Sequence, residues 1–98
     1  MEKKIVWNTR PSKSFASALK NISLESYQNA ELVEAAVLSA IEGIQEQPER
    51  YPPDKFKSEN KGDHRAFETH SYRVAYRVTD TQIRILRIRH VKQEPKPY

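Results

Sequence analysis

The spacing of apolar residues changes along the chain, and each change marks a different kind of secondary structure. Residues 4–7 are rich in β-branched and aromatic side chains, which predicts a short first strand. In residues 11–47 apolar side chains recur every three or four positions, the spacing that gives a helix one apolar face. A polar break over residues 23–29 interrupts this pattern, and Pro48 prevents its continuation. The segment is therefore predicted to be a hairpin of two helices.

The period shortens to two residues after residues 51–63, a polar segment rich in proline and lysine that we expect to be an exposed loop. Alternating side chains predict strands at residues 65–69, 72–78 and 83–90, with turns between them. In the last of these strands, apolar residues occupy both the odd-numbered and the even-numbered positions, so both faces carry apolar side chains. This pattern indicates a central strand or a β-bulge. The tail, residues 92–98, contains two prolines and cannot continue a sheet ladder.

A pair of helices followed by a run of strands is typical of an α+β fold. We expect an N-terminal strand, a two-helix hairpin and an antiparallel meander of three strands, with the helices packed on one face of the sheet. The other face is then left for polar side chains. At 98 residues the chain has the length of one domain, and residues 1–98 are predicted to form one.

Composition excludes several classes of protein. The absence of cysteine excludes disulfides, thiolate metal ligands and a thiol nucleophile. The two glycines, Gly43 and Gly62, are too few for a glycine-rich phosphate loop, and the histidines and acids lack the spacing of metal ligands. We therefore expect no cofactor and no metal. The chain has no apolar stretch long enough to cross a membrane, and its start lacks the apolar core of a signal peptide, so a cytoplasmic protein is expected.

The net charge of +4 is unevenly distributed. Residues 1–50 hold six Lys and Arg against seven Asp and Glu, a net of −1, whereas residues 51–98 hold eleven against six, a net of +5. Arginines gathered on one sheet face are typical of a polyanion-binding protein, because guanidinium groups offer paired donors to phosphate oxygens. The alternative is an ordinary exposed face whose arginines pair with Glu68, Asp80 and Glu94.

One histidine, His90, closes the arginine-rich last strand. Metal-free RNA cleavage needs a base for the 2′-hydroxyl, a cation for the developing phosphorane charge and an acid for the leaving oxygen. Together with Arg73, and with Tyr98 or Lys92 nearby, His90 could supply these groups. It could equally be a polar surface residue at a strand end. Two further histidines fall in predicted turns and are assigned no role: His64 and His70.

Two segments of the meander carry a resemblance to a known family. They read Arg-Ala-Phe-Glu-Thr-His-Ser-Tyr-Arg-Val-Ala-Tyr-Arg-Val over residues 65–78 and Ile-Arg-Ile-Leu-Arg-Ile-Arg-His over residues 83–90. This combination resembles the signature of the RelE/ParE toxins of bacterial type II toxin–antitoxin modules. The predicted order of elements and the length extend the similarity over the whole chain.

The resemblance implies one of two activities. RelE-like members cut mRNA on the ribosome without a metal, and ParE-like members block DNA gyrase with no known catalytic site. A ribosome-dependent mRNA endoribonuclease is our first expectation, and gyrase inhibition is the alternative. A third hypothesis is a degenerate toxin that only binds its antitoxin. Each of these toxins would have a cognate antitoxin, encoded by a neighbouring gene, whose acidic or amphipathic segment wraps the sheet and the hairpin.

For a nuclease, the resemblance also implies the site. Arg73, His90 and Tyr98 match positions that RelE-like enzymes use. Arg65 and Arg73 would hold the scissile phosphate, His90 would act as general base or acid, and Tyr98 would stack on or orient a base. The residues expected to grip the RNA backbone are Lys55, Lys57, Arg77, Arg89 and Lys92.

Overall fold

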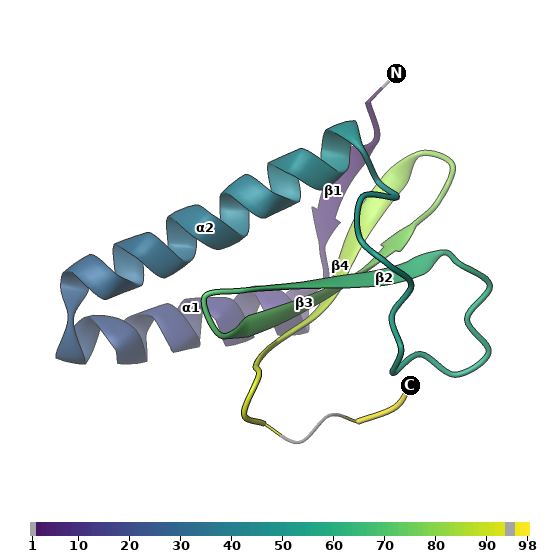
Figure 1. Cartoon of the computed structure of the whole chain (residues 1–98). Coiled ribbons are helices and arrows are strands. Elements are labelled where there is room, and N and C mark those ends of the chain that lie inside the picture. Colours follow the sequence, from purple (N-terminus) through teal and green to yellow (C-terminus); the bar gives the residue numbers. More distant parts are fainter. Residues whose placement is uncertain (1, 94–95) are drawn as a thin grey trace.

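The computed structural model describes residues 2–93 and 96–98, and within them the elements follow the predicted order (Figure 1). The strands and helices are β1 (Lys4–Trp7), α1 (Thr9–Glu25), α2 (Tyr27–Glu46), β2 (His64–Thr69), β3 (Tyr72–Val78) and β4 (Gln82–His90). The predicted α+β fold, with its strand, helical hairpin and three-stranded meander, is confirmed. None of the helices in the described part of the chain is long and apolar enough to cross a membrane.

The four strands form one mixed sheet in the order β1-β4-β3-β2. The meander strands pair antiparallel, whereas β1 pairs parallel to β4, with Ile5 opposite Ile83. A parallel pair needs a long crossover connection, and the helical hairpin, followed by the rest of the chain up to β4, supplies it. As a result β4 is a central strand with a neighbour on each side.

Apolar residues occupy both odd and even positions of β4, first because the strand is central and second because it contains a bulge. Ala75 of β3 lies opposite Arg87, but the next residue, Tyr76, lies opposite Ile85, so Leu86 is the extra residue. The extra residue lets side chains three positions apart, such as Arg84 and Arg87, point to the same face. Both interpretations of this segment, central strand and bulge, are therefore confirmed.

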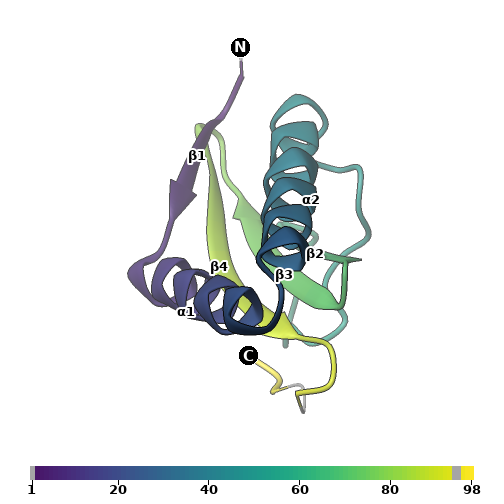
Figure 2. The ribbon, with the colours of Figure 1, turned by 90° about the vertical axis from the view of Figure 1, so that its left-hand side faces the viewer.

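The two helices cover the same face of the sheet (Figure 2). The hairpin turn is tighter than the predicted polar break, because Ser26 alone separates the helices and its side-chain oxygen accepts a hydrogen bond from the Asn29 amide at 3.1 Å. The buried core between helices and sheet consists of Phe15, Val33, Val37, Ile41, Ile44, Phe67, Val74, Tyr76, Ile83, Ile85 and Ile88.

The segment from residue 51 to residue 63 runs along the outer edge of β2. The Asp54 amide donates to the His64 carbonyl at 2.8 Å, and Pro53 forms a bridge with Arg65. The prediction of an exposed loop is wrong at one position, since Asp54 is only 3% exposed. A carboxylate this deeply buried must be paired, and its partners lie on the sheet face opposite the helices.

Candidate functional site

The sheet face opposite the helices, called the open face below, is built from three rows of residues across β2, β3 and β4. Residues directly opposite one another in an antiparallel pair point to the same side. The rows are His64–Arg77–Arg84, Ala66–Ala75–Arg87 and Glu68–Arg73–Arg89. The predicted concentration of arginines on one face is therefore present, with five arginines in these rows.

Arg73, the residue expected to hold a scissile phosphate, is bonded to two carboxylates. Its Nη2 donates to Asp54 Oδ1 at 2.7 Å and its Nη1 to Glu68 Oε2 at 2.9 Å. Asp54 also accepts hydrogen bonds from the Tyr98 hydroxyl at 2.7 Å and from the Phe56 amide at 3.1 Å. Loop, sheet and C-terminal tail thus meet at one buried carboxylate.

The ionisation of Asp54 and Tyr98 follows from this geometry. Burial alone would raise the pKa of Asp54, but the hydrogen bonds from Tyr98, Arg73 and the Phe56 amide outweigh it and lower the pKa below 3.8. Burial, followed by the bond to Asp54, raises the pKa of the Tyr98 phenol above its ordinary value. Asp54 is therefore an anion and Tyr98 a neutral donor at neutral pH.

Acid is expected to weaken this contact. Because the pKa of Asp54 is lower in the folded chain than in the unfolded one, its stabilising contribution is complete above about pH 5 and is lost as the pH falls through the folded value, below about pH 4. Urea unfolding followed from pH 7 to pH 3 measures this loss. The Asp54→Asn variant, which lacks the ionisable group, should show a shallower decline, and an equally steep decline in both proteins would contradict the assignment.

The C-terminal residue is held by its backbone as well as its side chain. The Tyr98 amide donates to the Phe56 carbonyl at 2.9 Å, and the Ser58 amide donates to the Tyr98 carbonyl at 2.5 Å. Cations lie over both aromatic rings, with Arg87 4.7 Å from the centre of Tyr98 and Arg73 4.9 Å from the centre of Phe56. Tyr98, the residue expected to stack on or orient a base, lies against the arginines of the open face, where its hydroxyl bonds to Asp54 and its ring contacts Arg87.

Two of the expected catalytic residues point away from the open face. Arg73 lies opposite Arg89, so His90, one position further, points to the helix side, where it lies opposite Tyr72 with ring centres 5.3 Å apart. Arg65 lies opposite Tyr76 and donates to the Tyr51 carbonyl at 2.6 Å. The structure thus brings Arg73 and Tyr98 together and separates both from His90 and Arg65.

The lysines and arginines expected to bind RNA are also divided. Arg77 and Arg89 belong to the open face, and Lys57 reaches it from the loop, with its Nζ 5.4 Å from the centre of the Tyr98 ring. Lys55 is exposed beside Phe56, at 5.2 Å from the ring centre. Lys92 follows β4 and lines, with His90, a groove of about 860 Å³ against α1.

Acids neutralise the open face only in part. Glu68 pairs with Arg73 as the alternative interpretation predicts, but Asp80 takes part in none of the ion pairs found in residues 2–93 and 96–98. Glu94 lies outside the described residues. Nothing in the sequence predicts the pairing of Asp54, because it is one of three acids in the loop of residues 51–63 and no periodic pattern distinguishes it from the other two.

Of the other four arginines of the open face, Arg77 donates to the Asp63 carboxylate at 3.1 Å, and within the described residues the other three donate to uncharged oxygens. The bonds are Arg84 to Asn8 Oδ1 at 2.9 Å, Arg87 to the Lys96 carbonyl at 2.7 Å and Arg89 to the Gln93 carbonyl at 2.9 Å. Burial and the neighbouring charges of Arg73 and Arg87 lower the pKa of Arg89, which reflects the local excess of positive charge. The open face is therefore a basic surface with a neutralised centre at Arg73.

No set of three potential metal-ligating side chains comes together in the part of the chain that the structure describes.

Comparison with family models matches residues 5–95 to the family described as ParE toxin of type II toxin-antitoxin system, parDE. A search of curated proteins found no match. The matched segment includes both helices and the whole meander, so it covers the fold and the open face together. The chain therefore belongs to the ParE toxin family of type II toxin–antitoxin systems, within the RelE/ParE superfamily.

Proposed function

We propose that this toxin inhibits DNA gyrase by binding, without catalysing a reaction. The observation that carries the proposal is the bonding of Arg73, whose guanidinium donates to Asp54 and Glu68. Charge-assisted bonds to two carboxylates offset the positive charge that a scissile phosphate would require. The position of His90 on the helix side supports the same conclusion, because a general base must lie within hydrogen-bonding reach of the proton it removes.

Membership of the ParE family adds support, because the resemblance described in the sequence analysis implies gyrase inhibition for ParE-like members. Toxins of this family pair with a ParD antitoxin, as the family description indicates. We infer that this chain likewise has a cognate antitoxin encoded by a neighbouring gene. Co-expression of the two genes with a tag on the toxin should yield a complex, and a toxin that purifies alone would contradict this partner.

The experiment that tests the function uses the purified toxin in two assays. It is added to a gyrase supercoiling reaction and, separately, to a ribosome-based translation reaction programmed with mRNA. We expect supercoiling to be inhibited while the mRNA stays intact. Cleaved mRNA together with unaffected gyrase would contradict the proposal and favour the nuclease.

The His90→Ala substitution separates the two mechanisms by its magnitude. Removal of a general acid or base from a nuclease would lower the rate by about 10²- to 10⁴-fold. Because His90 lies on the helix side, away from Arg73, we expect the variant to arrest growth as effectively as the wild type. A titrated promoter in growing cells measures this, and a loss of arrest in a variant that remains folded would contradict it.

A ribosome-dependent mRNA endoribonuclease is the second candidate. It is favoured by one observation, the cations that surround two aromatic rings on the open face. Such an arrangement suits the phosphates and bases of a single strand. Under this candidate the backbone of the mRNA would contact Lys55, Lys57, Arg77, Arg89 and Lys92.

A further inference from the structure

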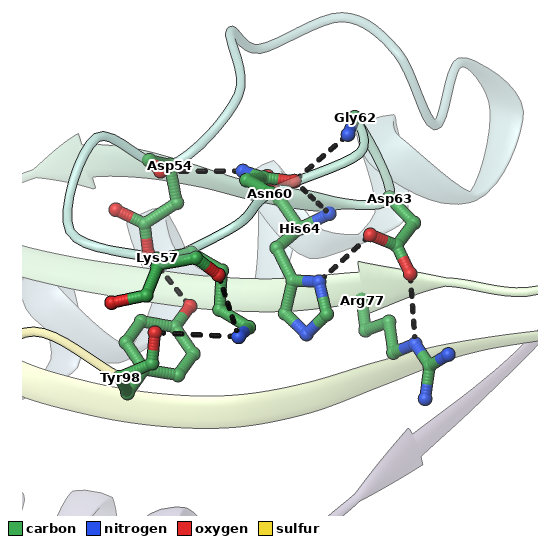
Figure 3. Close-up of polar contacts among 9 residues, drawn as sticks. Asp54, Lys57, Asn60, Gly62, Asp63, His64, Arg77 and Tyr98 are labelled. Carbon is green, nitrogen blue, oxygen red and sulfur yellow. Dashed lines mark hydrogen bonds and ion pairs between the residues drawn. The ribbon is translucent and has the colours of Figure 1, made fainter.

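One carboxylate at the edge of the open face holds two nitrogen-bearing side chains at once. Asp63 Oδ1 lies 2.9 Å from His64 Nδ1, and Asp63 Oδ2 accepts from Arg77 Nε at 3.1 Å (Figure 3). The bond with His64 is the larger cause, ahead of the bond with Arg77, of a lowered pKa of Asp63, so the carboxylate is ionised at neutral pH. The three side chains form a fixed unit that neither the predicted catalytic set nor the Arg73 network includes.

The backbone that carries Asp63 and His64 is itself held in place. Asn60 Oδ1 accepts from the amides of Gly62 at 2.8 Å and His64 at 3.3 Å, while Asn60 Nδ2 donates to the His64 carbonyl at 2.7 Å (Figure 3). Gly62 has a φ of +96°, which a side chain would strain. This turn therefore fixes the position from which His64 and Asp63 project.

Within residues 2–93 and 96–98, each partner of Asp63 keeps nitrogen atoms that have no hydrogen-bond partner. His64 binds Asp63 through Nδ1, which leaves Nε2, and Arg77 binds through Nε, which leaves both Nη groups. In Figure 3 these free atoms turn away from Asp63 to the same side. The Arg77 side chain is 51% exposed. The His64 side chain is 14% exposed, so it is reached from solvent at its edge while the rest of the ring is covered.

The surroundings of this unit are positively charged. Arg84 of β4 lies opposite Arg77 of β3, and within the part of the chain that the structure describes it donates to the uncharged side-chain oxygens of Asn8 and Gln82. Lys57 projects from the loop toward the Tyr98 end of the site, where its Nζ lies 3.1 Å from the Ser58 carbonyl (Figure 3). Two acids lie near this unit: Asp63, which is bonded to His64 and Arg77, and the buried Asp54, which is bonded to Arg73 and Tyr98.

We propose that His64 and Arg77 form a two-point clamp for a phosphodiester of a nucleic-acid strand, with Asp63 as the positioning residue. Protonated His64 donates from Nε2 to one phosphate oxygen, and the Nη groups of Arg77 donate to the same phosphate. The basic rows through Arg84 and Arg87 continue beside the clamp and accommodate the neighbouring phosphates. This site does not depend on the proposed inhibition of gyrase, and its test contains no gyrase.

The bond with Asp63 sets which nitrogen of His64 faces the ligand. Since Nδ1 is directed to Asp63, Nε2 is the ring atom that donates to a phosphate oxygen when it carries a proton. The groups that face His64 are Asp63 from the preceding turn, Arg77 from β3 and Tyr98 from the tail. Of these Tyr98 stays neutral, because burial and then its bond to Asp54 raise its pKa.

Fluorescence anisotropy with labelled single strands of DNA and RNA, each about twelve nucleotides long, tests the clamp. His64→Gln, which removes the imidazole held by Asp63, should lower the affinity of the protein for both strands. Arg77→Gln should lower affinity about fivefold and reduce the slope of log K against log salt by about 0.7. Preference for one of the two strands identifies the natural nucleic acid. His70→Asn is the matched control, because His70 is exposed at the hairpin turn and asparagine tolerates its φ of +48°.

The sign of the Asp63→Asn effect gives the sharpest test. If the open face binds phosphates only through diffuse charge, removal of a negative charge must raise affinity. If Asp63 positions the clamp, affinity falls, because Arg77 loses its acceptor and His64 its anionic partner. A rise in affinity, or unchanged binding by folded Arg77→Gln and His64→Gln proteins, overturns the proposal, whatever the outcome of the gyrase assay.

Discussion

Replacement of Asp54 by alanine is expected to lower the free energy of unfolding by about 3 kcal/mol. The substitution leaves Arg73 without its buried partner, at a site where the Asp54 side chain is 1% exposed. It also removes the acceptor of the Tyr98 hydroxyl, which links the tail to the sheet. Urea denaturation at pH 7 measures the change, and it is a large share of the roughly 5 to 15 kcal/mol that stabilises a domain.

Two control variants separate the contributions of this network. Tyr98→Phe removes only the hydroxyl and should cost about 1 kcal/mol. The double variant Asp54→Leu with Arg73→Met replaces the ion pair by apolar groups and should recover part of the loss, because neither charge is then buried alone. If Asp54→Ala costs no more than Tyr98→Phe, Asp54 does not hold the network together.

Replacement of Tyr76 by alanine should cost about 4 kcal/mol, the largest effect expected for a single substitution in this chain. Tyr76 is fully buried in β3, and its ring packs near Phe67 with ring centres 6.4 Å apart. Truncation leaves a cavity between the sheet and the helices that the core cannot close. Chemical denaturation of the variant, with far-UV circular dichroism as the probe, measures the loss.

Tyr76→Phe is the matched control, because it keeps the ring and removes one hydrogen bond. The hydroxyl donates to the Pro48 carbonyl at 3.0 Å, and burial, the main cause, raises the pKa of Tyr76 to about 12, which keeps it protonated as a donor. We expect a cost of about 1 kcal/mol. Equal losses in the two variants would show that the hydroxyl, and not the ring, is the important group.

The type of each element, and the face on which each of its side chains lies, could be predicted because both depend on neighbouring residues in the sequence. A period of three to four residues marks the helices, and alternation in residues 72–78 places Arg73 and Arg77 on the face opposite Val74, Tyr76 and Val78, as the structure has it. The mixed parity of the last strand likewise indicated the bulge at Leu86. Each of these features is a local property of the backbone.

The composition of the site, in contrast, depends on contacts between distant segments. Arg73 and His90 are separated by the pairing register of β3 and β4, which sets Arg73 opposite Arg89 and directs His90 to the helices. Asp54 and Tyr98 are 44 positions apart and meet only because loop and tail both fold against the open face. Adjacent residues in sequence can lie on opposite faces of a sheet, while distant residues share one carboxylate.

The fold class, the family and the presence of a basic sheet face could therefore be predicted from the order of the residues, because periodicity, residue type and charge are already present in the unfolded chain. The tertiary structure decided which cations on that face are neutralised. In the folded chain Arg73 pairs with the buried Asp54, and His90 points to the helix side of the sheet. His64 and Arg77 are both bonded to Asp63. The physical reason is that burial and pairing of charges arise only when register, loop and tail bring remote groups within a few ångströms.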